Sequence, residues 1–181
     1  MTPARYRQIF VENINRSMLD TPIGPLRIMA SKNAILCVEQ TGRESREAGS
    51  SASQIPADRV LPGDASGELV RDCEAELTEY FAGTRHDFDL PVLPEGTDFQ
   101  KNVWDKLRLI PYGETRTYGE LAAMTGSEKA SRAVGMANHC NPILILIPCH
   151  RVIGADGSLT GYAAGLAAKK YLLQLEQEAS A

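Results

Sequence analysis

The residues best suited to chemistry in this sequence follow a short apolar run. Five aliphatic residues, Ile143 to Ile147, precede Pro148, Cys149, His150 and Arg151. The run predicts a fully buried strand, which Pro148 ends because proline cannot donate to a strand ladder. A buried cysteine is usually an inert apolar residue. Here the neighbouring imidazole and guanidinium are expected to favour the thiolate, the reactive form, so Cys149 is the candidate nucleophile.

The imidazole cannot meet the thiol directly if both lie on one extended strand. Successive strand residues point to opposite faces, so either the chain turns at Pro148 or a water connects Cys149 with His150. The imidazole also needs a carboxylate to orient it. The acids close by in the sequence are Asp156, Glu176 and Glu178, and the pattern does not choose among them.

The remaining cysteines, Cys37, Cys73 and Cys140, form no CxxC pair with each other or with Cys149. The chain also has only three histidines, and its cysteines and histidines do not have the spacing of four zinc ligands. We therefore expect no bound metal. The chain has 181 residues, of which 43% are hydrophobic, so it can fill a core without disulfides. All four cysteines are therefore expected to be reduced, and Cys37 and Cys73 to be structural.

Composition indicates a globular protein of one domain or two small ones. The purest apolar run is far shorter than the roughly 20 residues of a membrane span, and charges interrupt the N-terminus, so we expect a cytoplasmic protein with no membrane helix or signal peptide. Residues 1–97 carry 10 basic and 15 acidic residues, whereas residues 98–181 carry 9 and 8. Contact with nucleic acid should therefore use the second half, and should be modest and salt-sensitive.

The first part of the chain is predicted to contain strands and one helix. Short apolar or alternating runs predict strands at Tyr6–Val11, Leu26–Ala30, Ile35–Val38 and Asp87–Val92. Residues 41–67 contain few large apolar side chains and predict a long surface loop. Helical spacing of apolar residues predicts an amphipathic helix from Leu69 to Phe81. Prolines and a glycine between residues 91 and 96 then divide the chain into domains 1–96 and 97–181.

The second part is predicted to be helical. Two capping boxes, Thr97 with Gln100 and Thr117 with Glu120, should start two helices, the second ending near Met124. After a glycine-bearing turn a third helix is expected over residues 128–138, and the two short helices suggest a helix-turn-helix. A hairpin turn at Asp156-Gly157 and a last helix around residues 166–175 complete the prediction.

The third of these helices has a face of small residues. Its inward face should consist of Ala130, Ala133, Val134 and Ala137, and its outward face of Ser131, Arg132, Gly135 and Met136. Glycine and small side chains on an exposed face let a partner approach the backbone, and Arg132 can reach beyond that contact. The alternative is a short connecting helix whose alanines fit a crowded core.

These motifs together resemble the O6-alkylguanine-DNA alkyltransferases, also called methylated-DNA--protein-cysteine methyltransferases. The resemblance is carried by Ile147–Val152 around the thiol, Ser131–Gly135 in the preceding helix and Asn141-Pro142 between them. It extends through Phe99-Gln100, Val103-Trp104, Ile110–Gly113, Thr117–Ala122 and Gly161-Tyr162. It thus covers about residues 98–177 densely and the N-terminal half loosely, through Thr21–Leu26.

The resemblance implies an α+β fold, with a small N-terminal α/β domain of ribonuclease H-like type and a C-terminal helix-turn-helix domain of winged-helix-like type. It implies DNA repair by irreversible, stoichiometric transfer of an alkyl group from O6-alkylguanine to Cys149, with O4-alkylthymine left open as a second substrate. The protein would act as a monomer on double-stranded DNA, bound through the minor groove with the damaged base flipped out. No cofactor or metal is implied.

The resemblance also implies residue roles. Cys149 would be the nucleophile, with His150 as a base acting through a water, Glu176 orienting His150, Asn141 bracing the turn and Tyr118 donating to the departing guanine. The DNA side would comprise Arg132, which fills the space of the flipped base, and Ser131, Gly135, Arg151, Val152, Tyr162 and Ala163. Trp104 is expected in the core. Ala164 stands where many members have glycine, which implies a pocket less suited to bulky adducts.

Two other functions are alternatives to DNA repair for this sequence. A cysteine hydrolase or acyltransferase would need an oxyanion hole and a directly bonded pair of Cys149 and His150, neither of which the sequence signals. A noncatalytic DNA-damage-binding module would have no use for the thiol, and its function would survive Cys149→Ser. Transfer to the thiol is therefore the preferred hypothesis.

Overall fold

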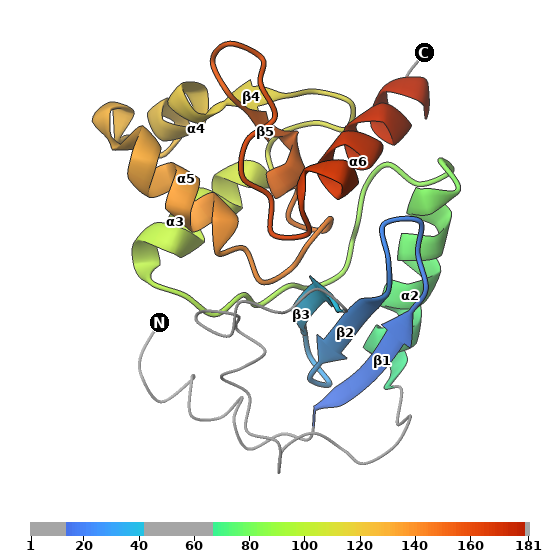
Figure 1. Cartoon of the computed structure of the whole chain (residues 1–181). Helices are drawn as coiled ribbons and strands as arrows, with labels where there is room; N and C mark the ends of the chain where they lie inside the picture. Colours follow the sequence, from blue (N-terminus) through green and yellow to red (C-terminus); the bar gives the residue numbers. More distant parts are fainter. Residues whose placement is uncertain (1–13, 42–66, 180–181) are drawn as a thin grey trace.

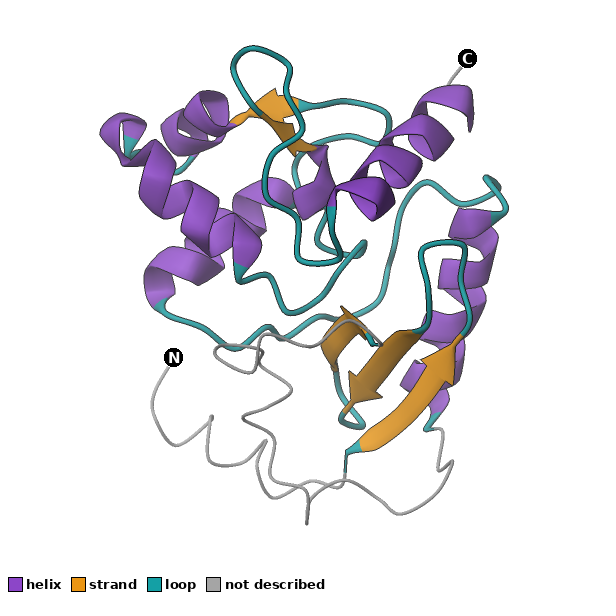
Figure 2. Ribbon diagram, in the orientation of Figure 1, coloured by secondary structure: helices purple, strands orange, loops and turns teal. Residues whose placement is uncertain are grey.

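The computed structural model describes residues 14–41 and 67–179. The strand predicted at Tyr6–Val11 and nearly all of the loop predicted over 41–67 lie outside these ranges. The described chain forms a small sheet with one helix against it, followed by a mainly helical second part (Figure 1, Figure 2). Within the same ranges, no helix combines the length and the apolar character needed to cross a membrane.

The N-terminal sheet is antiparallel, with β1 (Asn15–Leu19), β2 (Leu26–Ala30) and β3 (Ile35–Gln40) in that order. A tight turn joins β2 to β3, and in it Ser31 Oγ accepts from the backbone N–H of Ala34 at 3.2 Å. The sequence does not predict β1, because this strand is mostly polar and only Ser17 is buried in it.

Helix α2 (Glu68–Phe81) packs beside the sheet, as its apolar periodicity predicts (Figure 1). Its buried residues are Val70, Cys73, Leu77 and Tyr80, which follow a helical stripe. Burial of this stripe against the strands builds the N-terminal core and places Tyr80 near the end of the helix, toward the second part of the chain.

The prediction of a strand at Asp87–Val92 is wrong. Only one bridge forms there, in which Ile35 donates to Pro91 O at 2.8 Å and Leu93 donates to Ile35 O at 2.9 Å. Pro91 and Pro94 lack the N–H that a continuous ladder would need.

Two helices begin at the predicted capping boxes. Helix α3 (Asp98–Leu107) is capped reciprocally by Thr97 and Gln100, and α4 (Tyr118–Met124) by Thr117 and Glu120. Trp104 of α3 is buried, and its Nε1 donates to Ala137 O at 2.8 Å. This bond joins α3 to α5 (Ser131–His139), so Trp104 belongs to the core, as predicted.

The helix predicted over 128–138 is divided in two. A single 3-10 turn, η3 (Glu128–Ala130), precedes α5, which starts at Ser131. The buried stripe of α5 runs through Val134, Ala137 and Asn138. The prediction that Ala133 packs inward is therefore wrong, and this residue is exposed.

The run Ile143–Ile147 is buried as predicted, but it is not a strand. Ile145 has a φ of 73°, and Ile147 donates to Ile143 O at 3.1 Å, which closes a turn. A short run that is buried on all sides is apolar whatever its backbone conformation. The apolar pattern therefore cannot distinguish a buried strand from a buried turn. The segment docks on β3, where Val38 donates to Pro142 O at 3.0 Å and accepts from Leu144 at 2.8 Å.

The rest of the second part consists of a short strand pair, a turn and a last helix. A short parallel pair joins β4 (Arg116–Thr117) to β5 (Val152–Ile153), and α6 (Leu166–Ala179) forms the last helix, which the sequence predicts. The turn at Asp156-Gly157 forms, with Gly154 donating to Ser158 O at 2.8 Å. No second strand follows it, so the hairpin prediction is wrong beyond the turn itself.

Candidate active site

The candidate nucleophile lies in a tight turn. After Pro148 the chain forms one 3-10 turn, η4 (Cys149–Arg151), and the Cys149 N–H donates to Ile147 O at 2.8 Å. Of the two arrangements left open by the sequence, the chain therefore does turn at Pro148. The turn leaves Cys149 only 1% exposed, so a substrate must be brought to the sulfur.

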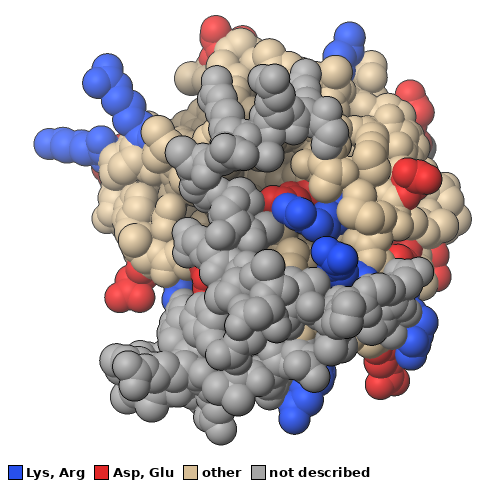
Figure 3. All heavy atoms as spheres, turned by 60° about the horizontal axis from the view of Figure 1, so that its bottom comes forward, with Lys and Arg blue, Asp and Glu red and all other residues tan. Residues whose placement is uncertain are grey.

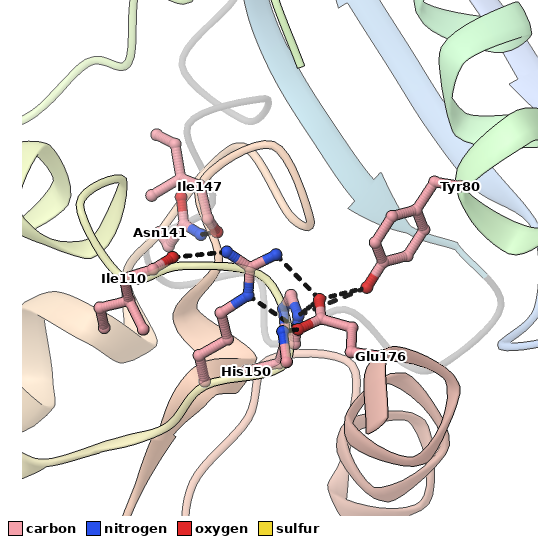
Figure 4. Close-up of polar contacts among 8 residues, drawn as sticks. Tyr80, Ile110, Asn141, Ile147, His150 and Glu176 are labelled. Carbon is pink, nitrogen blue, oxygen red and sulfur yellow. Dashed lines mark hydrogen bonds and ion pairs between the residues drawn. The ribbon is translucent and has the colours of Figure 1, made fainter. Parts of the chain in front are cut away.

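Asn141 holds this turn in place. Its Nδ2 donates to Ile147 O at 2.8 Å and lies 3.0 Å from Cys149 Sγ, while its Oδ1 accepts from the Ile143 N–H at 3.0 Å. Figure 4 shows Asn141 lying against Ile147. One amide thus fixes both ends of the apolar turn and contacts the sulfur that follows it.

The thiol of Cys149 is neutral at physiological pH. Burial raises the pKa of Cys149 to about 11, although the hydrogen bond from Asn141 and the charge of Lys169 act to lower it. The prediction that His150 and Arg151 stabilise a thiolate is wrong, because both side chains bind Glu176 instead. A proton must therefore leave the sulfur as it reacts.

Glu176 lies at the centre of a buried polar cluster (Figure 4). Its Oε1 accepts from Tyr80 OH at 2.7 Å and from Arg151 Nη2 at 3.0 Å, and lies 2.7 Å from His150 Nε2. Its Oε2 accepts from Arg151 Nε at 2.9 Å and from the Gly113 N–H at 3.1 Å. Among the three acids left open by the sequence, only Glu176 meets His150, and Asp156 and Glu178 are exposed.

The cluster fixes the charges of its members. Burial alone would raise the pKa of Glu176, but the hydrogen bonds and charges of His150 and Arg151 bring it well below its usual value. Burial lowers the pKa of His150. A neutral imidazole whose Nε2–H faces an ionised carboxylate leaves Nδ1 as the acceptor, and this Nδ1 is buried with no hydrogen-bond partner in the described residues.

Arg151 belongs to this cluster and not to a DNA-binding surface. The side chain is 6% exposed, and besides Glu176 its Nη1 donates to Ile110 O at 2.6 Å. Its guanidinium carbon also lies 5.6 Å from the centre of the Tyr112 ring. The expectation that Arg151 lies beside the base is corrected, because its donors are directed into the protein.

Two polar residues near the thiol were not predicted from the sequence. Asn138 Nδ2 donates to Cys149 O at 3.3 Å. Lys169 Nζ donates to Val152 O at 2.5 Å and Thr160 O at 2.7 Å, and burial lowers the pKa of this lysine to about 8. A charged residue on the apolar stripe of α6, three residues before Leu172, is the sequence signal that would have found it.

Besides Arg151, the residues expected on the DNA side lie on α5, in β5 and on the loop before α6. Arg132 is exposed, and Ser131 and Gly135 are partly buried. Tyr118 lies against Gly135, where a Cβ would approach the tyrosine ring to 3.6 Å. Gly135 of α5 therefore lies next to the ring of Tyr118, the first residue of α4.

The loop before α6 surrounds the active site from the other side. Tyr118 OH donates to Thr160 O at 3.2 Å, which connects α4 to this loop. Tyr162 is buried with its ring centre 6.4 Å from that of His150, Val152 and Ala164 are also buried, and Ala163 is exposed.

Comparison with known proteins finds one family for both parts of the chain. Residues 98–178 match the family described as 6-O-methylguanine DNA methyltransferase, DNA binding domain, and residues 14–94 match its ribonuclease-like domain. A methylated-DNA--protein-cysteine methyltransferase of Methanosarcina acetivorans is 47% identical over 161 residues, which cover 88% of this chain and 96% of that protein. The protein of the same name from Mycobacterium bovis is 45% identical over 168 residues, covering 91% and 93%.

Solved structures lead to the same family. A crystal structure of Mycobacterium tuberculosis O6-methylguanine methyltransferase aligns with a TM-score of 0.78 at 40% identity, over 91% of this chain and 93% of that one. Mycobacterium tuberculosis OGT in complex with DNA aligns with a TM-score of 0.77 at 40% identity, over 92% and 94%. Since both parts of the chain match the two domains of one family, and its relatives align over nearly their whole length, the chain belongs to the methylated-DNA--protein-cysteine methyltransferases.

Proposed function

We propose that the protein repairs DNA by moving an alkyl group from O6-alkylguanine to its own Cys149. The observation that carries the proposal is a buried thiol, braced by Asn141, beside the pair of His150 and Glu176. A bond forms between Sγ and the alkyl carbon as the bond between that carbon and O6 breaks. The thiol proton passes to His150, and the guanine takes up a proton in place of the alkyl group. A thioether is a poor leaving group, so each protein acts once.

In this reaction His150 acts as the general base through its Nδ1. Its Nε2 is already engaged by Glu176, and Nδ1 is the ring nitrogen still able to accept a proton. We assign a water to the step between Sγ and Nδ1. Glu176 stabilises the imidazolium that forms, because its carboxylate stays ionised beside it.

The burial of Cys149 supports flipping of the damaged base. The alkyl carbon of a base inside the duplex cannot reach a sulfur that is 1% exposed, so the nucleotide must leave the stack. We propose that α4 and α5 act as a helix-turn-helix whose second helix enters the minor groove. Ser131 and Gly135 allow close approach, and Arg132 fills the space of the flipped base. Support for DNA as the partner comes from the related OGT structure in complex with DNA.

The pocket for the flipped base is assigned to residues around the thiol. Backbone groups of Val152 and Ala163 would bind the base edge, with Tyr162 as a wall. Tyr118 would donate to the guanine as it departs, which requires its hydroxyl to leave Thr160 O, its present acceptor. The methyl group of Ala164 is expected to slow reaction with bulky adducts.

We further propose that the protein acts as a monomer in the cytoplasm. One chain supplies the nucleophile, the base, the carboxylate and the proposed DNA contacts. All four cysteines are free thiols, and a reducing compartment keeps them so.

The proposal is tested by mass spectrometry of the protein after mixing with a duplex that contains one O6-methylguanine. We expect a gain of one methyl group on the peptide with Cys149, saturating at one per protein. Cys149→Ser should abolish the gain, whereas Cys140→Ser, a neighbouring thiol outside the site, should retain it. Duplex binding without any gain would instead favour a damage-binding module, and a gain on another peptide would identify a different nucleophile.

A further inference from the structure

We propose that Tyr80 is a positioning residue of the transfer reaction, which fixes from helix α2 the carboxylate oxygen that orients His150. The inference rests on the proposed function and adds a residue from the buried stripe of α2. Tyr80 does not approach the thiol itself, so its effect is exerted through Glu176 and His150.

The geometry places three groups around one oxygen atom. Glu176 Oε1 accepts from Tyr80 OH at 2.7 Å and lies 2.7 Å from His150 Nε2, while the tyrosine oxygen is 3.4 Å from that same Nε2. Figure 4 shows Tyr80 pointing at Glu176 from the side opposite to Asn141. The tyrosine and the imidazole therefore share an acceptor, and each donor reduces the negative charge available to the other.

Tyr80 is held so that its hydroxyl has little freedom to move. The residue is 0% exposed, and its ring lies 5.6 Å from that of Phe88 and 6.0 Å from that of Tyr112. The hydroxyl is therefore directed at Glu176 by packing, and does not have to be ordered when substrate arrives.

Tyr80 contacts the Glu176 carboxylate from the part of the chain before residue 97. The other contacts come from the peptide of Gly113 and from the side chains of His150 and Arg151. Within the part of the chain that the structure describes, helix α2 thus contributes a hydroxyl group to the active site.

The consequence is a shift in the protonation of His150. The titratable or charged groups near His150 are Tyr80 from α2, Cys149 and Arg151 from η4, Tyr162 from the following loop, and Lys169 and Glu176 from α6. Removal of the Tyr80 hydroxyl leaves more charge on Oε1 and stabilises the imidazolium. His150 would then be protonated at a higher pH and lost as a base over a wider acidic range.

The experiment compares single-turnover transfer rates of wild-type protein and Tyr80→Phe across pH. We expect the rate at neutral pH to fall by about 10- to 150-fold, the range for a lost hydrogen bond to a charged group, with duplex affinity unchanged. The acid limb of the profile should move to higher pH. Tyr112→Phe is the matched control, because this neighbouring ring has a buried hydroxyl without a partner in the described residues.

Two further measurements separate positioning from packing. Replacement of Tyr80 by 3-fluorotyrosine keeps the ring and strengthens the donor, so the acid limb should move to lower pH. Nitrogen-15 NMR of the His150 ring measures its titration without any substrate. The titration should move to higher pH in Tyr80→Phe and to lower pH with 3-fluorotyrosine. An unchanged His150 titration in both variants overturns the inference, while transfer by the wild type in the same assay leaves the proposed function standing. The inference is also overturned if the transfer rate of Tyr80→Phe falls only in proportion to the fraction of protein that is folded.

Discussion

Cys149 and Glu176 are both almost completely buried, yet they have opposite protonation states. Cys149 has one amide against its sulfur, so burial dominates and the pKa of the thiol rises to about 11. Glu176 has donors on both oxygens, two of them from the guanidinium of Arg151, and these outweigh its burial. The number and charge of the donors therefore decide whether the pKa of a buried group rises or falls from its ordinary value.

Acidification is expected to destabilise the protein in two stages. Burial lowers the pKa of His150 in the fold, so stability is full above the unfolded value of about 6.5 and falls as the pH drops below it. The lowered pKa of Glu176 adds a second loss below about pH 4.3, the unfolded value for glutamate. Each stage has a limiting slope of about 1.4 kcal/mol per pH unit.

Urea unfolding at a series of pH values measures both stages. His150→Gln should remove the first stage, whereas His139→Gln, an exposed residue, should leave it in place. A free energy of unfolding that stays constant from about pH 7 to 5 in the wild type would contradict the buried, neutral state of His150.

Helix α5 has one face buried in the core and one face exposed. Val134 and Ala137 pack into the core, and Ala137 O accepts from Trp104. Met136 on the opposite face is 64% exposed, beside the exposed Arg132. The helix is therefore held rigidly on one side while the other side is available to a partner.

Arg132→Ala is expected to slow repair of duplex DNA by about tenfold or more, because the cost of unstacking the base is no longer offset by insertion of the side chain. Reaction with the free alkylated base involves no unstacking and should change less than about twofold. Single-turnover rates with the two substrates measure the difference, with exposed Lys129→Ala on η3 as the control. Equal losses with both substrates would exclude the proposed finger.

Over the whole molecule, the two matched parts of the chain are joined by specific contacts. Backbone bonds connect Val38 of β3 with Pro142 and Leu144, and Tyr80 connects α2 with Glu176 of α6. Basic and acidic side chains are interspersed on the face shown in Figure 3, in keeping with a net charge of −4. With a net charge of −4, DNA binding should depend on a few placed contacts more than on a broad positive field.

These contacts predict that the two parts unfold in one transition. Fluorescence of Trp104, the single tryptophan, follows the second part, and labelling of the buried thiol of Cys37 follows the sheet. Their urea midpoints should coincide, because breaking the shared contacts exposes unpaired groups on both sides. Two separated midpoints would show that the parts are independently stable.

Local signals allowed much of the fold to be predicted. The capping boxes of α3 and α4 and the apolar stripe of α2 depend on residues within one or two turns, and these elements form as expected. The residues Ile147–Val152 alone indicate the family, because the motif is contained in six consecutive positions.

What could not be predicted depends on contacts between distant residues. Tyr80 and Glu176 are 96 positions apart, and no local pattern shows that they meet. The thiolate was expected from the neighbours of Cys149 in sequence, but those side chains are directed to Glu176. The sequence predicts a strand where the chain turns at Ile145, because burial on all sides removes the periodicity that would distinguish a strand from a turn.

The burial of Cys149 also bears on how long the unreacted protein survives in a cell. With a pKa of about 11, about one thiol in ten thousand is ionised at pH 7. Peroxides and stray electrophiles attack thiolates, and oxidation beyond the sulfenic acid is not readily reversed. We therefore expect a protein that reacts once to keep this thiol intact until it meets a damaged base.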